Sequence, residues 1–273
     1  MGHRTTPAGL ALIELIIAMA LGITLVSAVL QFMIANNNTY KLNGDISRIQ
    51  ENGRIALDVL VRDLQMAGYR QPKTAGGRIP HFFLRRCNNT AANADQPADD
   101  NAIDACLLEG GGNRSDCIAI QLDPPPDDGT ETDCLGNTHL PRHSILVNVY
   151  TIARNNGISS LYCRGYDASD ERWLGPSAQP LVDGIDSLQI LYGVAASSDA
   201  PNSVTKYISG DSLGDDDWSN IRAAKVAILV SNGTINAFGE QRERRYRLLD
   251  SDILAFDDRQ LRRIFSTTVK FNN

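Results

Sequence analysis

The chain has 273 residues, a formal net charge of −6 at pH 7 and 42% hydrophobic residues. The net negative charge argues against a protein that binds the phosphate backbone of nucleic acids, because such a protein needs a basic face. The length allows one medium-sized domain with an additional N-terminal segment, and the hydrophobic content gives no sign of overall disorder.

The first predicted element is an apolar segment near the N-terminus. Residues 15–35 carry no charged side chain, and as a helix they would span about 31 Å, roughly the thickness of a bilayer core. The segment is too long to be the core of a cleaved secretory signal. Arg4 lies in the polar residues that precede it, so the positive-inside tendency places these residues in the cytoplasm and everything after about Asn36 on the outer side. We therefore expect one membrane-spanning helix.

Glu14 lies at the N-terminal edge of this apolar segment. A carboxylate close to the hydrocarbon costs about 2.5–3.5 kcal/mol on insertion scales, so an incidental acid is not expected there. The presence of Glu14 indicates a partner that neutralises its charge.

The helical pattern continues beyond the membrane segment. Apolar residues recur at steps of three and four over residues 42–67, with most charged residues elsewhere. Gly68 can cap the end of the helix, and Pro72 prevents its continuation. We expect one helix over residues 10–69, about 90 Å long if straight, with a bend or flexible point at Asn36–Asn38.

The rest of the chain is predicted to be rich in β-structure. Residues 70–114 are irregular in sequence, and we expect a long surface excursion there. The expected strands are short and rich in β-branched and aromatic residues, and they cover residues 117–122, 144–152, 159–163, 188–192, 223–230, 246–249 and 264–271. The sequence Asn155-Asn156-Gly157 predicts a hairpin turn. Because no later helical pattern is long enough for crossover connections, the sheet should be antiparallel.

All five cysteines follow the membrane segment, and none lies in a CxxC pair or at zinc-type spacing. On the outer side of the membrane they would meet an oxidising compartment, where disulfides are the default state. Their odd number leaves at least one thiol unpaired, for which a buried free cysteine is the simplest interpretation.

Ligand sites have weaker signals. The acidic clusters 123–128 and 211–217 could bind calcium through carboxylate oxygens, but neither matches an EF-hand loop and solvated turns are favoured. His139 and His143 are four residues apart, yet Pro141 between them disrupts the helical face that a zinc pair would need. No catalytic or cofactor-binding motif is present, so we expect neither enzymatic activity nor a cofactor.

Gly9 before an apolar segment, with Glu14 five residues past the Gly9–Leu10 bond, resembles the processing site of type IV prepilins. That motif is shared by all pilins and by the pseudopilins of type II secretion. Later segments are similar to the PilW family of minor pilins, and these are residues 40–42, 47–54, 56–58, 62–69, 133–136, 161–163, 191–193, 218–220 and 265–269. The resemblance covers most of the chain and is thin over residues 72–114.

The resemblance implies that a prepilin peptidase of the inner membrane cleaves between Gly9 and Leu10 and methylates the new N-terminus. The family usually has Phe and Thr where this chain has Leu10 and Ala11, but cleavage depends chiefly on the glycine and should therefore occur. Cleavage would expose a cationic amine at Leu10. Glu14 of the same or a neighbouring subunit could then neutralise that amine within the lipid or the filament.

The resemblance also implies a disulfide between Cys134 and Cys163. A bond that closes a loop of about 30 residues would stabilise the fold by roughly 3–4 kcal/mol. Of the other cysteines, we expect Cys87 to pair with Cys106, which leaves Cys117 in the core.

The implied fold is α+β, with a long N-terminal helix packed on an antiparallel β-sheet head. Residues 1–9 would be the leader, 10–35 the membrane part of the helix, 36–70 its soluble half and 71–273 the head. Such a minor pilin would be held in the inner membrane with its head in the periplasm. It would join other minor pilins, the major pilin and the inner-membrane assembly machinery, prime the assembly of type IV pili and end near the tip of the fibre at the cell surface.

Two other functions fit the same sequence. One is a minor pseudopilin of type II secretion, which shares the N-terminal motif. The other is a tip adhesin or ligand-binding pilin, with calcium bound through residues 211–217.

Overall fold

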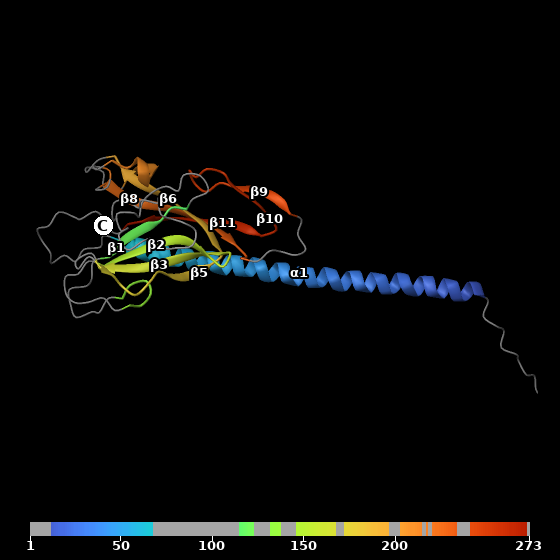
Figure 1. Ribbon diagram of the computed structural model, residues 1–273. Helices are drawn as coiled ribbons and strands as arrows, with labels where there is room; N and C mark the ends of the chain where they lie inside the picture. The colour runs from blue at the N-terminus through green and yellow to red at the C-terminus, as the bar shows by residue number, and fades with distance from the viewer. Residues whose placement is uncertain are drawn as a thin grey trace, which may run out of the picture. The chain divides into compact units, whose positions relative to one another are not determined.

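The computed structural model describes residues 12–67, 115–122, 132–137, 146–167, 172–196, 203–214, 217, 220–233 and 241–271. Within these residues, one helix is followed by β-strands β1–β11, and every strand pairing is antiparallel (Figure 1). The predicted α+β class is therefore confirmed. Contacts divide the chain into two compact units, residues 1–46 and 47–273.

Helix α1 (Leu12–Met66) is continuous through Asn36–Asn38, where a bend or flexible point was predicted (Figure 1). Each asparagine costs at most about 0.7 kcal/mol relative to alanine, too little to interrupt a helix that is already propagating. The helix ends after Met66, where the N–H of Ala67 donates to the carbonyl of Leu64 at 3.3 Å. This i to i−3 bond tightens the last turn, as is common at helix ends.

The first sheet contains β1 (Ile118–Leu122), β2 (Leu146–Asn155), β3 (Ile158–Asp167), β4 (Arg172–Trp173) and β5 (Gln179–Asp183). β2 and β3 form its centre, with β1 on β2 and both β4 and β5 on β3. Asn156 and Gly157 join β2 to β3 with φ angles of 48° and 81°, the left-handed geometry of a two-residue hairpin turn. The predicted hairpin is thus confirmed.

The second sheet has the strand order β11–β8–β6–β7. Its strands are β6 (Ile185–Ala195), β7 (Val204–Ser209), β8 (Ile221–Ser231) and β11 (Arg262–Lys270), and a 3₁₀ turn, η3 (Gly210–Ser212), follows β7. A separate two-stranded ribbon pairs β9 (Arg242–Tyr246) with β10 (Leu254–Asp258). Leu248 and Leu254 of the ribbon region pack with Ala227 and Leu229 of β8 in a small apolar cluster.

One buried arginine ties the β9–β10 ribbon to the second sheet. The side chain of Arg262 is 1% exposed, and its Nε donates to Asp186 of β6 at 2.7 Å. Its two terminal nitrogens donate to the carboxylate of Asp258 on β10, each at 2.7 Å, while the guanidinium lies 3.8 Å from the ring centroid of Phe256. The hydrogen bonds from Arg262 lower the pKa of Asp258 from its ordinary value, which favours the ionised carboxylate.

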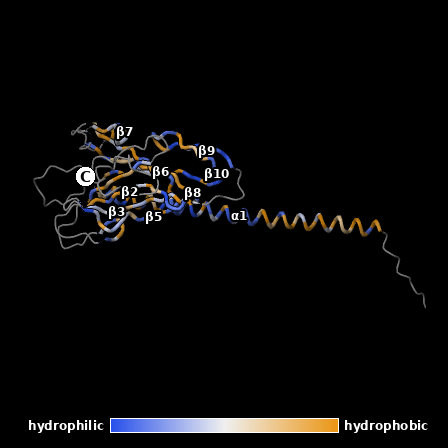
Figure 2. The backbone as a smooth tube through the Cα atoms, viewed as in Figure 1, coloured by the Kyte–Doolittle hydropathy of each residue, from blue (hydrophilic) through white to orange (hydrophobic). Residues whose placement is uncertain are grey.

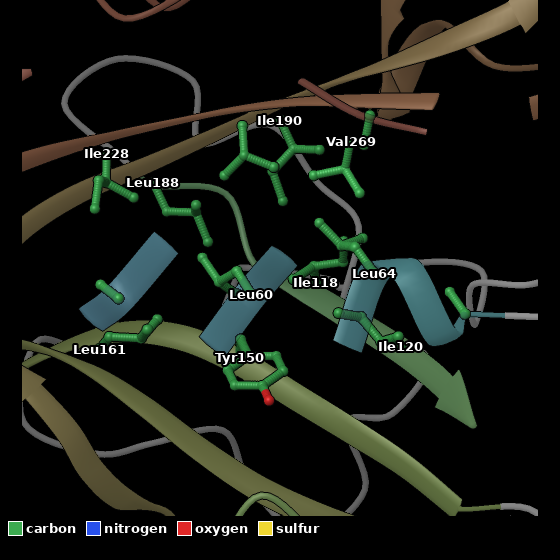
Figure 3. Close-up of a cluster of buried hydrophobic side chains, with 14 of the residues drawn as sticks. Leu60, Leu64, Ile118, Ile120, Tyr150, Leu161, Leu188, Ile190, Ile228 and Val269 are labelled. Atoms are coloured by element: carbon green, nitrogen blue, oxygen red, sulfur yellow. The ribbon is translucent and has the colours of Figure 1, made fainter. Parts of the chain in front are cut away.

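The buried face of α1 lies between the two sheets (Figure 3). Leu60 and Leu64 are fully buried at the centre of the main core cluster. Their neighbours come from both sheets, with Ile118, Ile120, Tyr150 and Leu161 on one side and Leu188, Ile190, Ile228 and Val269 on the other. Burying one side chain of this size is worth about 1.5–3 kcal/mol. The second half of the helix is therefore the centre of the head's core and not a cover on one sheet.

The predicted strands correspond to β1, β2, β3, β6, β8 and β11, with boundaries that differ by a few residues. The strand predicted at residues 246–249 is wrong, because β9 ends at Tyr246 and Leu249 has a φ of 46° in the following turn. The strands β4, β5, β7 and β10 escape prediction. They have six residues or fewer, are largely polar or exposed, and in β5 include Pro180.

Candidate assembly site

From Leu15 to Ile34, helix α1 has an uncharged, exposed and largely apolar surface. Orange, hydrophobic residues predominate along this part of the helix in Figure 2. Every large hydrophobic side chain from Leu12 to Ile34 is more than half exposed, and no charged residue occurs over residues 15–40. The helix contains an 18-residue stretch long and apolar enough to cross a membrane, with none of it buried. An apolar surface of this extent is stable only against lipid or other apolar helices.

Glu14 lies in the first turn of α1 and is exposed. The positive end of the helix dipole favours a carboxylate at this position by about 0.3–1 kcal/mol. The expected cleavage site, Gly9 and Leu10, lies outside the described residues. The pairing of Glu14 with a new N-terminal amine therefore stays a prediction.

A second carboxylate of α1, Asp63, lies on its buried face. It is 5% exposed, and one of its oxygens, Oδ2, accepts hydrogen bonds from Tyr150 Oη at 2.5 Å and from Asn148 Nδ2 at 2.8 Å. Burial, and after it the negative charge of Asp63, raises the pKa of Tyr150 well above its usual range, so the phenol remains a donor. The hydrogen bonds from β2 to Asp63 fix the last turns of α1 against the first sheet.

Sequence reasoning missed the role of Asp63. The signal was present, because Asp63 follows Leu60 by three residues and stands beside Leu64 on the apolar stripe of the helix. An acid on the stripe that faces the core requires buried donors elsewhere in the chain. Only the strand pairing identifies these donors as Asn148 and Tyr150.

Cys134 and Cys163 form a disulfide, with 6.4 Å between their Cα atoms. This is the pair that the family resemblance implied. Cys163 is fully buried in β3, whereas Cys134 is only partly buried in the turn at residues 133–137. The bond therefore joins a surface turn to a central strand of the first sheet.

Cys117 corrects the expectation for the remaining cysteines. It precedes β1 and is itself disulfide-bonded, so the predicted free thiol at this position is wrong. Cys87 and Cys106, which were expected to pair with each other, lie outside the described residues.

The described residues do not contain any of the ligand sites considered from the sequence in full. No group of three or more His, Cys, Asp or Glu side chains in the described part of the chain is arranged to hold a metal ion. The cluster 123–128 and the pair His139 and His143 lie outside it, and the cluster 211–217 is described only in part. In that cluster, Asp217 accepts a hydrogen bond from the N–H of Gly214 at 3.1 Å, as in an ordinary turn.

A groove of about 540 Å³ lies beside α1 in the head. Arg48, Glu51 and Ile55 line it from the helix, and the ends of β3, β5 and β8 form the other wall. Asn52 closes part of it by donating to the carbonyl of Asp183 at 2.9 Å. Charged and half-exposed apolar side chains both line the groove, a mixture that is typical of an ordinary protein surface.

The fold is pilin-like, with one long N-terminal helix that is apolar and exposed in its first half and an antiparallel β-rich head around its second half. Residues 149–273 match the model of a family described as type IV pilus-assembly protein W. This match confirms the resemblance to the PilW family over that part of the chain.

Comparison with solved structures gives a similarity to the type IV-like pilin TTHA1219 from Thermus thermophilus. The similarity has a TM-score of 0.41 and 13% sequence identity, and it covers 82% of this chain and 97% of that chain. No curated protein matches the chain.

Proposed function

We propose that this protein is a minor pilin that takes part in priming the assembly of type IV pili and is incorporated near the tip of the fibre. The observation that carries the proposal is the two-part helix α1, apolar and exposed over its first half and built into the core of the head over its second. The first half can exchange lipid for the helices of neighbouring subunits, while the second half belongs to the core of the head. The family match over residues 149–273 supports a role of this protein in pilus assembly.

In this proposal a prepilin peptidase cuts between Gly9 and Leu10 and methylates Leu10. The chain is first a single-pass protein of the inner membrane with its head in the periplasm. Glu14 then neutralises the N-terminal amine of its own or a neighbouring subunit, since an unpaired charge is costly in an apolar surrounding. Other minor pilins and the major pilin are the partners of the exposed helix.

Replacing Glu14 by Ala tests this role. Removing the carboxylate leaves the apolar surface intact, so the amount of protein in the membrane fraction should stay within about twofold of wild type. Surface piliation of cells that carry only the variant should fall by about tenfold, because a lost buried charge pair is worth well over 1.4 kcal/mol. Electron microscopy and a sheared-pilus assay measure piliation.

Asp58→Ala is the matched control, since Asp58 is an exposed carboxylate on the same helix and should leave piliation unchanged. Mass spectrometry of both variants checks that each begins at a methylated Leu10, which separates a defect in assembly from one in processing. Normal piliation by the Glu14→Ala variant would contradict the proposed role.

Deleting the whole chain separates the two pilin-type functions. Loss of surface pili with normal protein secretion supports the proposal. Loss of secretion with normal pili indicates a pseudopilin of type II secretion instead. A tip adhesin would be indicated by normal piliation with lost surface attachment.

A further inference from the structure

Four paired residues of β2 and β3 lie on the side of the first sheet that faces α1. We call them the block, and they are Asn148, Tyr150, Cys163 and Gly165. In the strand register, Asn148 pairs with Gly165 and Tyr150 pairs with Cys163. Residues two apart on a strand point to the same face, and Tyr150 and Cys163 both belong to the core cluster that contains Leu60 of the helix. All four positions therefore share one face.

The turn at residues 133–137 sits on this block. Asp133 organises the turn, since its Oδ1 accepts from the N–H groups of Leu135 at 2.9 Å and Asn137 at 2.8 Å. Its carboxylate lies directly over Gly165, where the Cβ of any other residue would overlap with it. The disulfide from Cys134 to Cys163 adds a covalent bond between the turn and the block.

The last turns of α1 contact the same block through Asp63, which accepts from Tyr150 and Asn148. Asn148 thus contacts both segments. Its Nδ2 donates to Asp63 at 2.8 Å, and its Oδ1 accepts from the backbone N–H of Cys134 at 3.1 Å. Since an ionised carboxylate only accepts and a backbone N–H only donates, these two partners fix the orientation of the carboxamide.

We propose that the Cys134–Cys163 disulfide is a redox-sensitive latch that, through Asn148, holds the helix turn around Asp63 in the head. With the bond closed, the N–H of Cys134 keeps the Asn148 carboxamide turned so that its amino group meets Asp63. With the bond open, the turn can leave the block, the carboxamide loses the partner that orients it, and Asp63 keeps only Tyr150 as a firm donor. The device belongs to the head and goes beyond the proposed role in pilus assembly.

The opening step is an exchange with a dithiol reductant. Cys163 is fully buried and Cys134 only partly, so the reductant's thiolate attacks Sγ of Cys134 and forms a mixed disulfide. The Cys134–Cys163 bond breaks, and its electron pair leaves on Sγ of Cys163, which takes up a proton. The second thiolate of the reductant then releases Cys134, which is protonated in turn, and the reductant ends as a disulfide.

Hydrogen exchange of the full chain in detergent micelles tests the latch, by comparing wild type with the double variant Cys134→Ser, Cys163→Ser. Amides of residues 60–66 should exchange about tenfold faster in the variant, whereas those of residues 49–55 should change by less than about threefold. An unchanged rate at residues 60–66, or an equal acceleration along residues 49–66, would overturn the proposal. The second outcome would mean a general loss of stability.

A double-mutant cycle tests the route through Asn148. In an Asn148→Ala background the serine pair should accelerate residues 60–66 by no more than about twofold further, because the coupling residue is already gone. Thr205→Ala is the matched control, since Thr205 donates to Val194 at 3.1 Å on an edge strand of the other sheet. In the Thr205→Ala background, the serine pair should still accelerate the exchange of residues 60–66 about tenfold. A full effect in the Asn148→Ala background would refute the route.

Discussion

At the scale of single residues, buried charges account for the most specific contacts of the head. Arg262 is surrounded by Asp186, Asp258 and the ring of Phe256, and Asp63 is surrounded by donors from β2. Each joins elements that are distant in sequence. A buried charge with complete hydrogen bonding contributes little net stability, but removing one partner leaves the other uncompensated and is costly.

Replacing Arg262 by Met should therefore destabilise the head by about 3–5 kcal/mol, because Asp186, 5% exposed, loses its guanidinium. Chemical denaturation of the detergent-solubilised chain, followed by circular dichroism, measures the loss. The neighbouring Arg263 is exposed, so Arg263→Met should change stability by less than about 0.5 kcal/mol. Similar small effects for both variants would contradict the role assigned to Arg262.

At the scale of elements, α1 is one helix with two different environments. The surroundings of two glycines in the helix show this difference. A Cβ at Gly53 would lie 2.7 Å from ring atoms of Phe265 on β11, whereas a Cβ at Gly44 would meet nothing within 4 Å. Gly53 thus allows close approach of β11 to the helix, and Gly44 only weakens the helix.

The substitutions Gly53→Ala and Gly44→Ala should consequently have opposite effects. At Gly44, alanine should stabilise the helix by up to about 1 kcal/mol through its higher helix propensity. At Gly53, overpacking against Phe265 costs about 1–3 kcal/mol and should outweigh that gain. Thermal melting followed at the helical circular dichroism band compares the two. If both variants were stabilised equally, the packing of Phe265 on Gly53 would not be as described.

At the scale of the whole molecule, the head depends on the helix. Ile49, Ala56, Leu60 and Leu64 of α1 belong to the same core cluster as both sheets. Losing buried side chains of this kind costs about 2–5 kcal/mol for each large one, and the net stability of a domain is only about 5–15 kcal/mol. The sheets alone therefore lack a sufficient core.

A chain that lacks residues 1–46 should fold cooperatively, because it keeps every helical residue of the core. A chain that lacks residues 1–70 should not, even though it retains all the strands. Near-ultraviolet circular dichroism and a urea transition distinguish a packed head from a collapsed one. A cooperative transition in the shorter chain would show that the helix only covers the head.

Much of this architecture could be predicted from local pattern. The apolar run and the three-and-four spacing predicted α1, and the β-branched stretches predicted β1, β2, β3, β6, β8 and β11. The strands that escaped prediction have weak local signals: β7 is largely exposed, and β5 contains Pro180. They form strands because neighbouring strands supply hydrogen-bond partners, a contribution that no single segment contains.

By itself, the sequence determined the apolar N-terminal part of the helix, the acid at Glu14 at its start, the antiparallel character of the head and the hairpin at Asn156–Gly157. These features follow from residue periodicity and turn chemistry, which are local. Only the tertiary structure decided that α1 lies between two sheets, that Asp63 meets Asn148 and Tyr150, and that Cys117 is disulfide-bonded. Each of these depends on which distant segments the fold brings together, and burial gives the contacts their energy only once that packing exists.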